Sequence, residues 1–301
     1  MKIYLTGASG FVGGALARYC VAMGDEVVVP RRVMVGGIPE WSPLPTAGSV
    51  IVHCAARVHV MNETALDPSE EFRRANVEGT QRLASIACDT GVRRFVYLSS
   101  IKVNGEVTIA SQRYSPEDRP APVDAYGRSK LEAEIALRSI AERSNLEIVV
   151  VRPVLVYGPG VRGNFATMLR FLRSGVPLPL ASIDNRRSFI ALNNLVSFLR
   201  LCAHHPAAAN ETFLVSDGDD LSTPDLLRLI GDAIGHPARL FPCPIWLLQA
   251  LGALAGRSSM VARLTDSLQV DISKARAILE WHPQKSVESM LAAFAVRTIA
   301  S

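Results

Sequence analysis

A tyrosine and a lysine four residues apart, with a serine well before them, could together move a proton at an alcohol carbon. They stand in Tyr126-Gly127-Arg128-Ser129-Lys130, and the serine is Ser100, at the end of the run FVYLSS. Positions i and i+4 of a helix share a face. We therefore predict that the Lys130 ammonium lies beside the Tyr126 phenol and lowers its pKa from about 10 towards the working pH. Ser100 would hydrogen-bond the reacting oxygen while a hydride moves at the same carbon.

A glycine-rich segment near the N-terminus predicts a dinucleotide site. It has the spacing G-x-x-G-x-x-G and lies between an apolar run and a pattern of helical spacing. Small residues let the backbone approach a pyrophosphate, whose charge is stabilised at the positive N-terminus of a helix. A tight turn without a ligand is the alternative. The residues expected to contact the cofactor here are Gly7, Ser9, Gly10, Phe11, Val12 and Gly13.

The residues after the second apolar run indicate which dinucleotide binds. A carboxylate there would accept hydrogen bonds from the ribose 2′-hydroxyl of NAD(H), whereas this chain has Pro30-Arg31-Arg32. Two guanidinium groups can hold a 2′-phosphate. Arg31 and Arg32 therefore favour NADP(H) over NAD(H), with an ordinary surface arginine pair as the alternative.

Alternating strand-like and helix-like patterns would position these residues. Apolar runs predict strands at 2–6, 26–29, 50–54, 95–99 and 147–151, and helical spacing predicts helices at 11–23, 72–90 and 125–144. Runs without polar alternation fit strands buried on both sides, and strands that alternate with helices favour a parallel sheet. The predicted fold class is α/β, a Rossmann-type doubly wound parallel sheet with a smaller mixed C-terminal substrate lobe.

The rhythm changes after about residue 153, where prolines and glycines cluster. We divide the chain into residues 1–160, a dinucleotide-binding domain that also takes in part of the later chain, and residues 161–301, a substrate lobe. Ser222-Thr223-Pro224 predicts a helix start. The short stretch between the strands at 26–29 and 50–54 indicates that one crossover connection is trimmed.

Composition excludes several classes of protein. The chain has 301 residues, 49% of them hydrophobic and 20% charged, so extended disorder is excluded. Its net charge is +4, but the arginines occur in scattered pairs, and aromatic residues make up only 6%. A nucleic-acid surface needs a contiguous basic stripe. An anionic small molecule is the expected partner.

The cysteines favour a cytoplasmic protein, the histidines indicate no metal site, and the apolar segments indicate no membrane insertion. The five cysteines are far apart, which favours reduced thiols, and the six histidines show no metal-ligand spacing. The longest apolar stretch, Ile245 to Ala255, is too short to span a bilayer, so no membrane insertion is expected. We predict that it packs in the core or between domains; docking on a membrane surface is the alternative.

The serine, the Y-x-x-x-K and the glycine loop, in this order, resemble the extended short-chain dehydrogenase/reductase superfamily, in its nucleotide-sugar epimerase/dehydratase branch. His53-Cys54-Ala55-Ala56 resembles the H-x-A-A loop of that family, Asn76-Val77-Glu78-Gly79-Thr80 its N-V-x-G-T segment, and Arg152-Pro153 to Gly160 its R-P-x-x-x-Y-G-P-G stretch. The resemblance implies that Ser100, Tyr126 and Lys130 are catalytic. It also implies cofactor contacts from Cys54, Ala55, Ala56, Asn76, Tyr126, Lys130 and Pro153.

The later chain continues the resemblance. Arg187-Ser188-Phe189-Ile190 is similar to the R-D-[FY]-I motif, and Asp271 to Ala275 with Trp281 and Pro283 to the closing D-x-S-K-A…W-x-P segment. The substrate-binding residues that follow from it are Lys102, Asn164, Arg187 and Arg263. For each of them, a packing or surface role is the alternative.

Departures from the family narrow the expected reaction. Ser100 is followed by Ile101-Lys102, where 4,6-dehydratases carry Asp-Glu, so water elimination is not expected. We favour reduction of a UDP-4-keto-6-deoxy-HexNAc for bacterial surface polysaccharide. A UDP-glucose or UDP-GlcNAc 4-epimerase with tightly bound NAD is the close alternative, and a non-catalytic NADP-sensing regulator the remote one. The resemblance also implies a homodimer built through residues 72–90 and 126–144.

Overall fold

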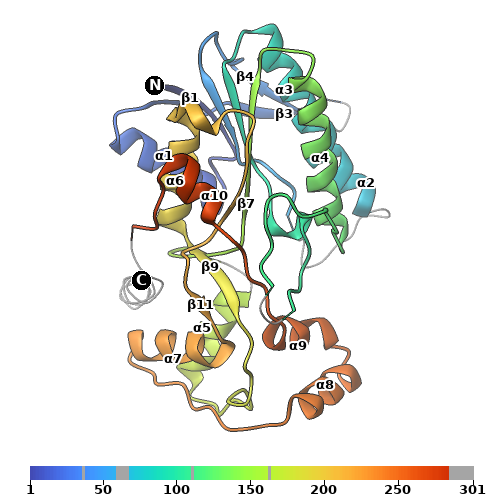
Figure 1. The fold of residues 1–301 in the computed structure, drawn as a ribbon, viewed down its shortest axis with the longest axis vertical. Helices are drawn as coiled ribbons and strands as arrows, with labels where there is room; N and C mark the ends of the chain where they lie inside the picture. The colour runs from blue at the N-terminus through green and yellow to red at the C-terminus, as the bar shows by residue number, and fades with distance from the viewer. Residues whose placement is uncertain (36–37, 59–67, 110–111, 162–163, 285–301) are drawn as a thin grey trace.

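Six parallel strands form the central sheet, in the order β10-β7-β6-β5-β1-β2 (Figure 1). The computed structural model describes residues 1–35, 38–58, 68–109, 112–161 and 164–284. Every neighbouring pair of these six strands is parallel. The strands are β1 Lys2–Thr6, β2 Glu26–Val28, β5 Val50–His53, β6 Arg94–Leu98, β7 Glu147–Pro153 and β10 Thr212–Val215.

Helices cover both faces of this sheet, which explains why its strands are apolar without alternation. One face packs on α1, α6 and α10, and the other on α3 and α4. The strand core is fully buried, as Val50, Ile51 and Val52 show. The doubly wound α/β fold predicted from the sequence is therefore confirmed. The bounds are α1 Phe11–Ala22, α3 Gly79–Asp89, α4 Ala125–Ala141, α6 Leu192–His204 and α10 Ser273–Leu279.

The helix predicted over 72–90 differs from the prediction in its first half. The chain forms α2 (Pro68–Phe72), then a π-helical stretch at Arg73–Glu78, and only then α3. The wide turn holds the buried Asn76, whose side chain bonds to two other segments. Interruptions of this kind are frequent at functional sites.

An antiparallel hairpin replaces the trimmed crossover. It consists of β3 (Arg31–Val35) and β4 (Ile38–Ser42). Trp41 anchors it, because its ring is 5% exposed and meets the His53 ring edge-on at 5.7 Å. Pro39 lies so close to α3 that a Cβ on Gly79 would come within 2.4 Å of its Cγ. Long-range contacts therefore create this hairpin, which the sequence analysis did not predict.

The later chain builds a smaller lobe with its own mixed sheet. Strand β9 pairs in parallel with β8 and antiparallel with β11. Helices α5 and α7 cover this sheet, and the predicted start of α7 is confirmed, since Ser222 Oγ accepts a hydrogen bond from the Asp225 amide. The bounds are β8 Leu155–Tyr157, β9 Arg187–Ala191, β11 Asp220–Leu221, α5 Asn164–Ser174 and α7 Thr223–Ala233.

A buried arginine ties the later chain to the central sheet. Arg94, at the start of β6, is 1% exposed. Its Nη1 donates to the carbonyls of Cys202 and His205, at 2.8 and 2.7 Å, at the C-terminal end of α6. Its Nε donates to Glu147 Oε2 at 2.7 Å. Arg94 thus stabilises the carbonyl groups that a helix leaves unpaired at its end.

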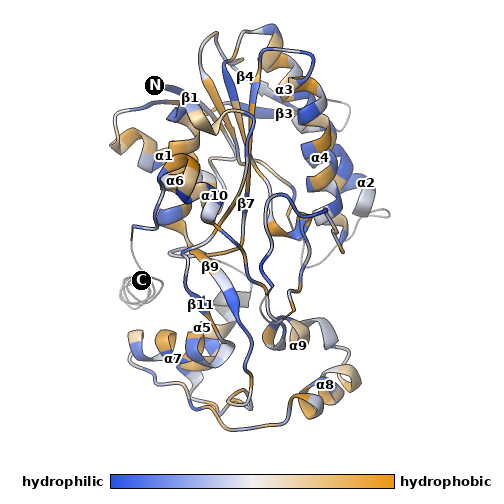
Figure 2. Cartoon of the chain, in the orientation of Figure 1, coloured by the Kyte–Doolittle hydropathy of each residue, from blue (hydrophilic) through white to orange (hydrophobic). Residues whose placement is uncertain are grey.

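The apolar stretch at 245–255 forms α8 (Ile245–Leu254), followed by α9 (Ser258–Thr265). The prediction of a core helix is wrong, because seven of the ten residues of α8 are exposed and only Gly252 is buried. Figure 2 shows apolar colouring along this helix at the far end of the lobe. Among the residues that the structure describes, no helix is long and apolar enough to cross a membrane.

Candidate active site

Four segments that the sequence singled out meet at one edge of the central sheet. Strands β1, β5, β6 and β7 are parallel neighbours, so their carboxyl ends lie together. The segments that follow or end these strands are the glycine loop, Cys54, Ser100 and Pro153. Ligands of open α/β sheets bind at this edge.

The glycine loop fits a dinucleotide because its shape leaves no room for side chains. Gly7 has φ +78°, and a Cβ there would lie 2.5 Å from the Ala55 amide nitrogen. A Cβ on Gly13 would lie 2.2 Å from the Gly7 carbonyl oxygen. Gly10 is the N-cap of α1, no described side chain caps this helix end, and its first turn holds no acidic residue. The free amides and the positive end of the helix suit a pyrophosphate.

A buried network fixes the loop against the neighbouring strand. His53 Nδ1 lies 2.6 Å from Thr6 Oγ1, and its Nε2 lies 3.0 Å from Thr80 Oγ1. The Ala55 amide donates to Thr6 Oγ1 at 3.4 Å. Burial lowers the pKa of His53 to about 3, with the Lys130 charge as a second cause, so the ring is neutral. His53 was quoted only as part of the H-x-A-A resemblance, and its histidine-threonine pairing had no signal in the sequence.

Asn76, expected to contact the cofactor, holds two protein segments together. Its Oδ1 accepts from the Arg57 amide at 2.7 Å, and its Nδ2 donates to the Arg57 carbonyl and to Ser129 Oγ, both at 3.0 Å. Ala55 and Ala56 lie in the segment that it holds. Asn76 therefore joins the chain after β5 to helix α4. Its hydrogen bonds in this structure position these two segments relative to each other.

Lys130 lies in the interior between α4 and the end of β6. Its Nζ donates to the Leu98 carbonyl at 2.8 Å and lies 4.5 Å from the centre of the Tyr97 ring. It lies 5.9 Å from the centre of the Tyr126 ring. Burial lowers the pKa of Lys130 to about 8, while the negative forms of Cys54 and Glu134 oppose this shift. The structure thus brings the predicted lysine and tyrosine together beside Cys54.

The surroundings of Tyr126 shift its pKa in the direction opposite to the prediction. Burial raises the pKa of Tyr126, and the charge of Asp124 raises it further. The prediction that Lys130 lowers this pKa is therefore wrong for this structure, because desolvation is the largest cause and the Lys130 ammonium is bonded to Leu98. The phenol stays protonated. Ser100 follows β6, where its Oγ accepts from the Lys102 amide at 3.3 Å and caps the short 3₁₀ turn Ile101–Val103.

A buried ion pair behind these residues was missed by the sequence analysis. Glu134 and Arg152 are each 1% exposed, and Arg152 Nη2 lies 2.5 Å from Glu134 Oε2. Glu134 Oε1 accepts from Ser99 Oγ at 2.5 Å, and Arg152 Nη1 donates to Asn104 Oδ1 at 2.9 Å. The available signal was that Glu134 follows Lys130 by four residues on the same face of a helix. The pair locks α4 to the serine that precedes Ser100.

Lys102, expected to bind substrate, is held by two carboxylates. Its Nζ lies 2.5 Å from Asp124 Oδ2 and 2.8 Å from Glu106 Oε1. Asp124 is also the N-cap of α4, since its Oδ1 accepts from the Gly127 amide at 2.7 Å. Lys102 therefore helps to fix the turn from which Tyr126 projects. An N-capping Asp just before a helical pattern is a signal that could have revealed Asp124.

The substrate-lobe arginines lie near this group. Arg187, at the start of β9, donates from Nη1 to the Asp266 carbonyl at 2.8 Å. Burial lowers its pKa, the charges of Asp266 and Glu106 raise it, and the charge of Arg263 lowers it. Arg187 and Arg263 are thus close enough to repel each other, which favours an anion between them. Asn164 begins α5, but its side chain lies outside what the structure describes.

Arg31 and Arg32 begin β3 and are both exposed. They follow β2, whose parallel pairing with β1 puts them at the same sheet edge as the glycine loop. Neither forms a salt bridge with a residue that the structure describes. Two unpaired guanidinium groups at this edge suit an added phosphate.

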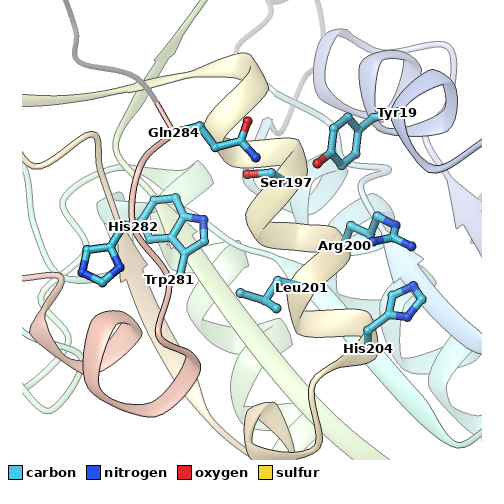
Figure 3. A pocket seen from close by; sticks show the side chains of 8 residues that line it. All are labelled: Tyr19, Ser197, Arg200, Leu201, His204, Trp281, His282 and Gln284. Atoms are coloured by element: carbon cyan, nitrogen blue, oxygen red, sulfur yellow. The ribbon is translucent and has the colours of Figure 1, made fainter. Parts of the chain in front are cut away.

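A separate cavity of about 290 Å³ lies on the face of the sheet opposite to α3 and α4. It lies between α1, α6 and the segment around Trp281 (Figure 3). Arg200 and His204 line it, and both contact Asp25. None of the predicted catalytic or substrate-binding residues lines it. Within the described ranges, no group of three or more His, Cys, Asp or Glu residues could hold a metal ion. The five cysteines are free.

The chain is similar to known proteins in its sequence and in its fold. The sequence profile of the NAD dependent epimerase/dehydratase family matches residues 3–216. A UDP-glucose 4-epimerase from Vibrio cholerae is 43% identical, covering 95% of this chain and 92% of its own length. A GDP-6-deoxy-D-mannose reductase from Pseudomonas aeruginosa is 29% identical, covering 77% and 79%. The structure of RMD from Pseudomonas aeruginosa complexed with NADPH shares the fold, with a TM-score of 0.78 at 22% identity over 98% of this chain and 99% of that one.

Proposed function

The chain belongs to the NAD dependent epimerase/dehydratase family, and from that premise we propose that it reduces the C4 ketone of a UDP-4-keto-6-deoxy-HexNAc with NADPH. It is an enzyme of the extended short-chain dehydrogenase/reductase class that acts with NAD(P) on nucleotide sugars. The observation that carries the choice of reaction is the exposed Arg31-Arg32 pair beside the glycine loop. An enzyme that consumes NADPH must bind this cofactor selectively and release it after each turnover.

Three residues of the chain have different roles in the reduction. When bound, the cofactor supplies the hydride that adds to C4. Tyr126 donates its phenolic proton to the C4 oxygen, so that the ketone gains one hydride and one proton. Ser100 donates a hydrogen bond to the same oxygen, and Lys130 holds the helix turn that aims the phenol. General acid catalysis of this kind contributes about 10²- to 10⁴-fold.

The reductive direction requires a protonated Tyr126. A tyrosine with its ordinary pKa of about 10 is already protonated at neutral pH, and burial raises this pKa further, so the proton needed by the forming alkoxide is present. An epimerase must begin with the opposite step, in which the tyrosine removes a proton from the C4 hydroxyl. Arg187 and Arg263 would hold the diphosphate of the substrate at the mouth of the site.

A UDP-glucose or UDP-GlcNAc 4-epimerase is the second candidate. One observation favours it, namely that the relative with 43% identity over nearly the whole chain is named a UDP-glucose 4-epimerase. The same serine, tyrosine and lysine would serve, with NAD retained throughout. A non-catalytic NADP-sensing regulator on this fold is the remote alternative, and the complete set of catalytic residue types counts against it.

One experiment separates these functions. The purified protein is examined for co-purified dinucleotide and then mixed with NADPH or NADH and a UDP-4-keto-6-deoxy-HexNAc while absorbance at 340 nm is followed. NADPH consumption with a 6-deoxy sugar product supports the reductase. Retained NAD with interconversion of UDP-hexoses and no net consumption would overturn it. Binding of NADPH without turnover of either substrate would support the non-catalytic NADP-sensing regulator.

We also propose a homodimer in which two copies pair through residues 72–90 and 126–144. Ile135 on α4 supports this, because it is 58% exposed on the helix face away from the sheet. Sedimentation equilibrium checks the assembly. A protein that remains monomeric at micromolar concentration, and is unaffected by Ile135→Glu, contradicts it.

A further inference from the structure

Helix α8 carries an exposed apolar surface that the proposed reaction does not use. Trp246 is 68% exposed and Leu254 is 85% exposed. Gln249 is the only polar residue in the helix. An apolar helix is normally buried, and an exposed apolar patch on a folded protein marks an interaction site. No element that the structure describes covers this face of the helix.

The attachment of α8 leaves its apolar face pointing outward. The helix packs on α9, where a Cβ on Gly252 would lie 2.5 Å from Val261 Cγ2. Leu248 packs towards the lobe core. Trp246, Ala250 and Leu254 are spaced four residues apart and therefore share one face, and the exposed Leu251 lies next to Leu254, three residues before it. All three are exposed, and the α8–α9 pair lies at the end of the lobe far from the central sheet (Figure 1).

Between Asp232 and Asp266, the stretch of chain that contains α8 has charged residues of one sign only. Residues 233–265 contain Arg239 and Arg257, besides the Arg263 already assigned to the substrate site, but no Asp or Glu. All three arginines are exposed, and none forms a salt bridge with a carboxylate in the described part of the chain. A short helix with Trp and Leu on one face and arginines beside it fits the boundary between anionic lipid headgroups and acyl chains.

We propose that α8 docks the protein on the surface of an anionic lipid bilayer, with Trp246, Leu251 and Leu254 entering the boundary between headgroups and acyl chains. Ten residues make a helix about 15 Å long, half the thickness of the bilayer core, so α8 lies on the surface. A second copy of the chain fits less well. A symmetric contact would bring the arginines of both copies together without a carboxylate to offset them.

The tryptophans make docking directly measurable. Trp41 and Trp281 are buried, at 5% and 6% exposed, so a change in tryptophan fluorescence reports on Trp246. The purified full chain is mixed with vesicles of phosphatidylcholine alone or of equal parts phosphatidylcholine and phosphatidylglycerol. We expect a blue shift of the emission and co-sedimentation with the anionic vesicles, and much weaker binding to the neutral ones. Trp246→Phe should remove the blue shift but keep most of the co-sedimentation.

Matched double variants test the surface itself. Leu251→Glu/Leu254→Glu should weaken binding to anionic vesicles by about tenfold or more. Val21→Glu/Met23→Glu changes two exposed apolar residues near the end of α1, at 61% and 51% exposed, and should leave binding unchanged. Both should keep the circular dichroism spectrum and melting temperature of the wild type, which shows that they are folded. The proposal does not rest on the proposed reaction, so its test does not depend on turnover.

Three results would overturn the proposal. The wild-type protein could stay in solution with anionic vesicles. Binding could be lost equally in the α1 control pair. The protein could instead self-associate through α8, shown by dimers that Leu251→Glu/Leu254→Glu dissociates while vesicle binding is absent, which would make a second copy the occupant.

Discussion

The ammonium of Lys130 donates a hydrogen bond to the carbonyl oxygen of Leu98, 2.8 Å away, in the last residue of β6. This bond joins the helix that carries Tyr126 to the strand that leads to Ser100. The lysine therefore contributes by position as well as by charge. Because it is 2% exposed, it also makes the stability of the fold depend on pH.

Stability should rise with pH relative to a variant without this ammonium. Lys130 has a pKa of about 8 in the folded protein and about 10.5 unfolded, so the unfolded chain binds more protons between these values. The free energy of unfolding of the wild type, relative to Lys130→Met, should increase by about 2.5 kcal/mol from pH 7 to pH 10. Urea denaturation at several pH values measures this. Parallel curves for the two proteins would show that Lys130 is not desolvated.

Removing the phenolic hydroxyl should abolish turnover and leave the fold intact. Tyr126→Phe keeps the ring contact with Phe72, whose centroid lies 6.1 Å away, but has no proton to donate. We expect kcat to fall by about 10²- to 10⁴-fold with an unchanged Kd for NADPH. Tyr19→Phe, in the remote cavity, is the control and should keep wild-type kcat. A Tyr126→Phe enzyme with near-normal kcat would remove the tyrosine from the mechanism.

A methyl group on Gly7 should clash with the neighbouring backbone, and the same change at Gly48 separates this clash from backbone strain. Gly7 and Gly48 have similar φ angles, +78° and +72°, but a Cβ on Gly48 meets nothing within 4 Å. Gly48→Ala should cost about 1–2 kcal/mol, the cost of a left-handed backbone alone. Gly7→Ala should cost clearly more and abolish NADPH binding, as measured by denaturation and calorimetry. Equal costs for the two would show that the loop can move away from Ala55.

The buried ion pair should matter far more than a surface pair of the same type. Glu134→Gln removes the negative charge that faces the buried Arg152 and should lower the free energy of unfolding by about 3 kcal/mol. It should also lower kcat, because Ser99 loses its charged acceptor next to Ser100. Glu40→Gln breaks the exposed pair with Arg82 and should cost less than about 1 kcal/mol. A Glu134→Gln protein as stable as the control would contradict the network.

Cofactor preference should depend on the two arginines of β3. Arg31→Ser/Arg32→Ser should raise the Kd for NADPH by roughly 10- to 100-fold and change the Kd for NADH little, since only the 2′-phosphate is lost as a partner. Arg18→Ser, an exposed arginine on α1, is the control. Equal weakening of both cofactors would place the arginines on the shared pyrophosphate instead.

The sequence predicted those parts of the fold that depend on local pattern. The runs KIYLT and VIVH and the Ser222 cap became the elements expected of them, since strand burial and capping are decided within a few residues. The β3–β4 hairpin was not predicted, because IPEWS contains a proline and a glutamate and is held by Trp41 on His53, a contact across the fold.

The site was predictable in its chemistry and less so in its electrostatics. The spacing of Tyr126 and Lys130 correctly placed them on one helix face, yet the direction of the tyrosine pKa shift depends on burial, which spacing does not reveal. The pairing of Glu134 with Arg152 joins residues from a helix and a strand, and Arg152 was quoted only as part of a motif. The exposure of α8 likewise depends on how few elements lie against it.

The hydrogen bonds from Arg94 to the end of α6 also constrain the order of events during synthesis. An emerging chain completes β6 early, but the carbonyl partners of Arg94 lie at residues 202–206. The strand that closes this side of the sheet, β10, ends only at Val215. The first half of the chain, which already contains Glu147, therefore leaves the ribosome without the carbonyl partners of Arg94 and with a sheet edge open. At this stage the open sheet edge is prone to aggregation, and a chaperone would protect the chain most by covering it.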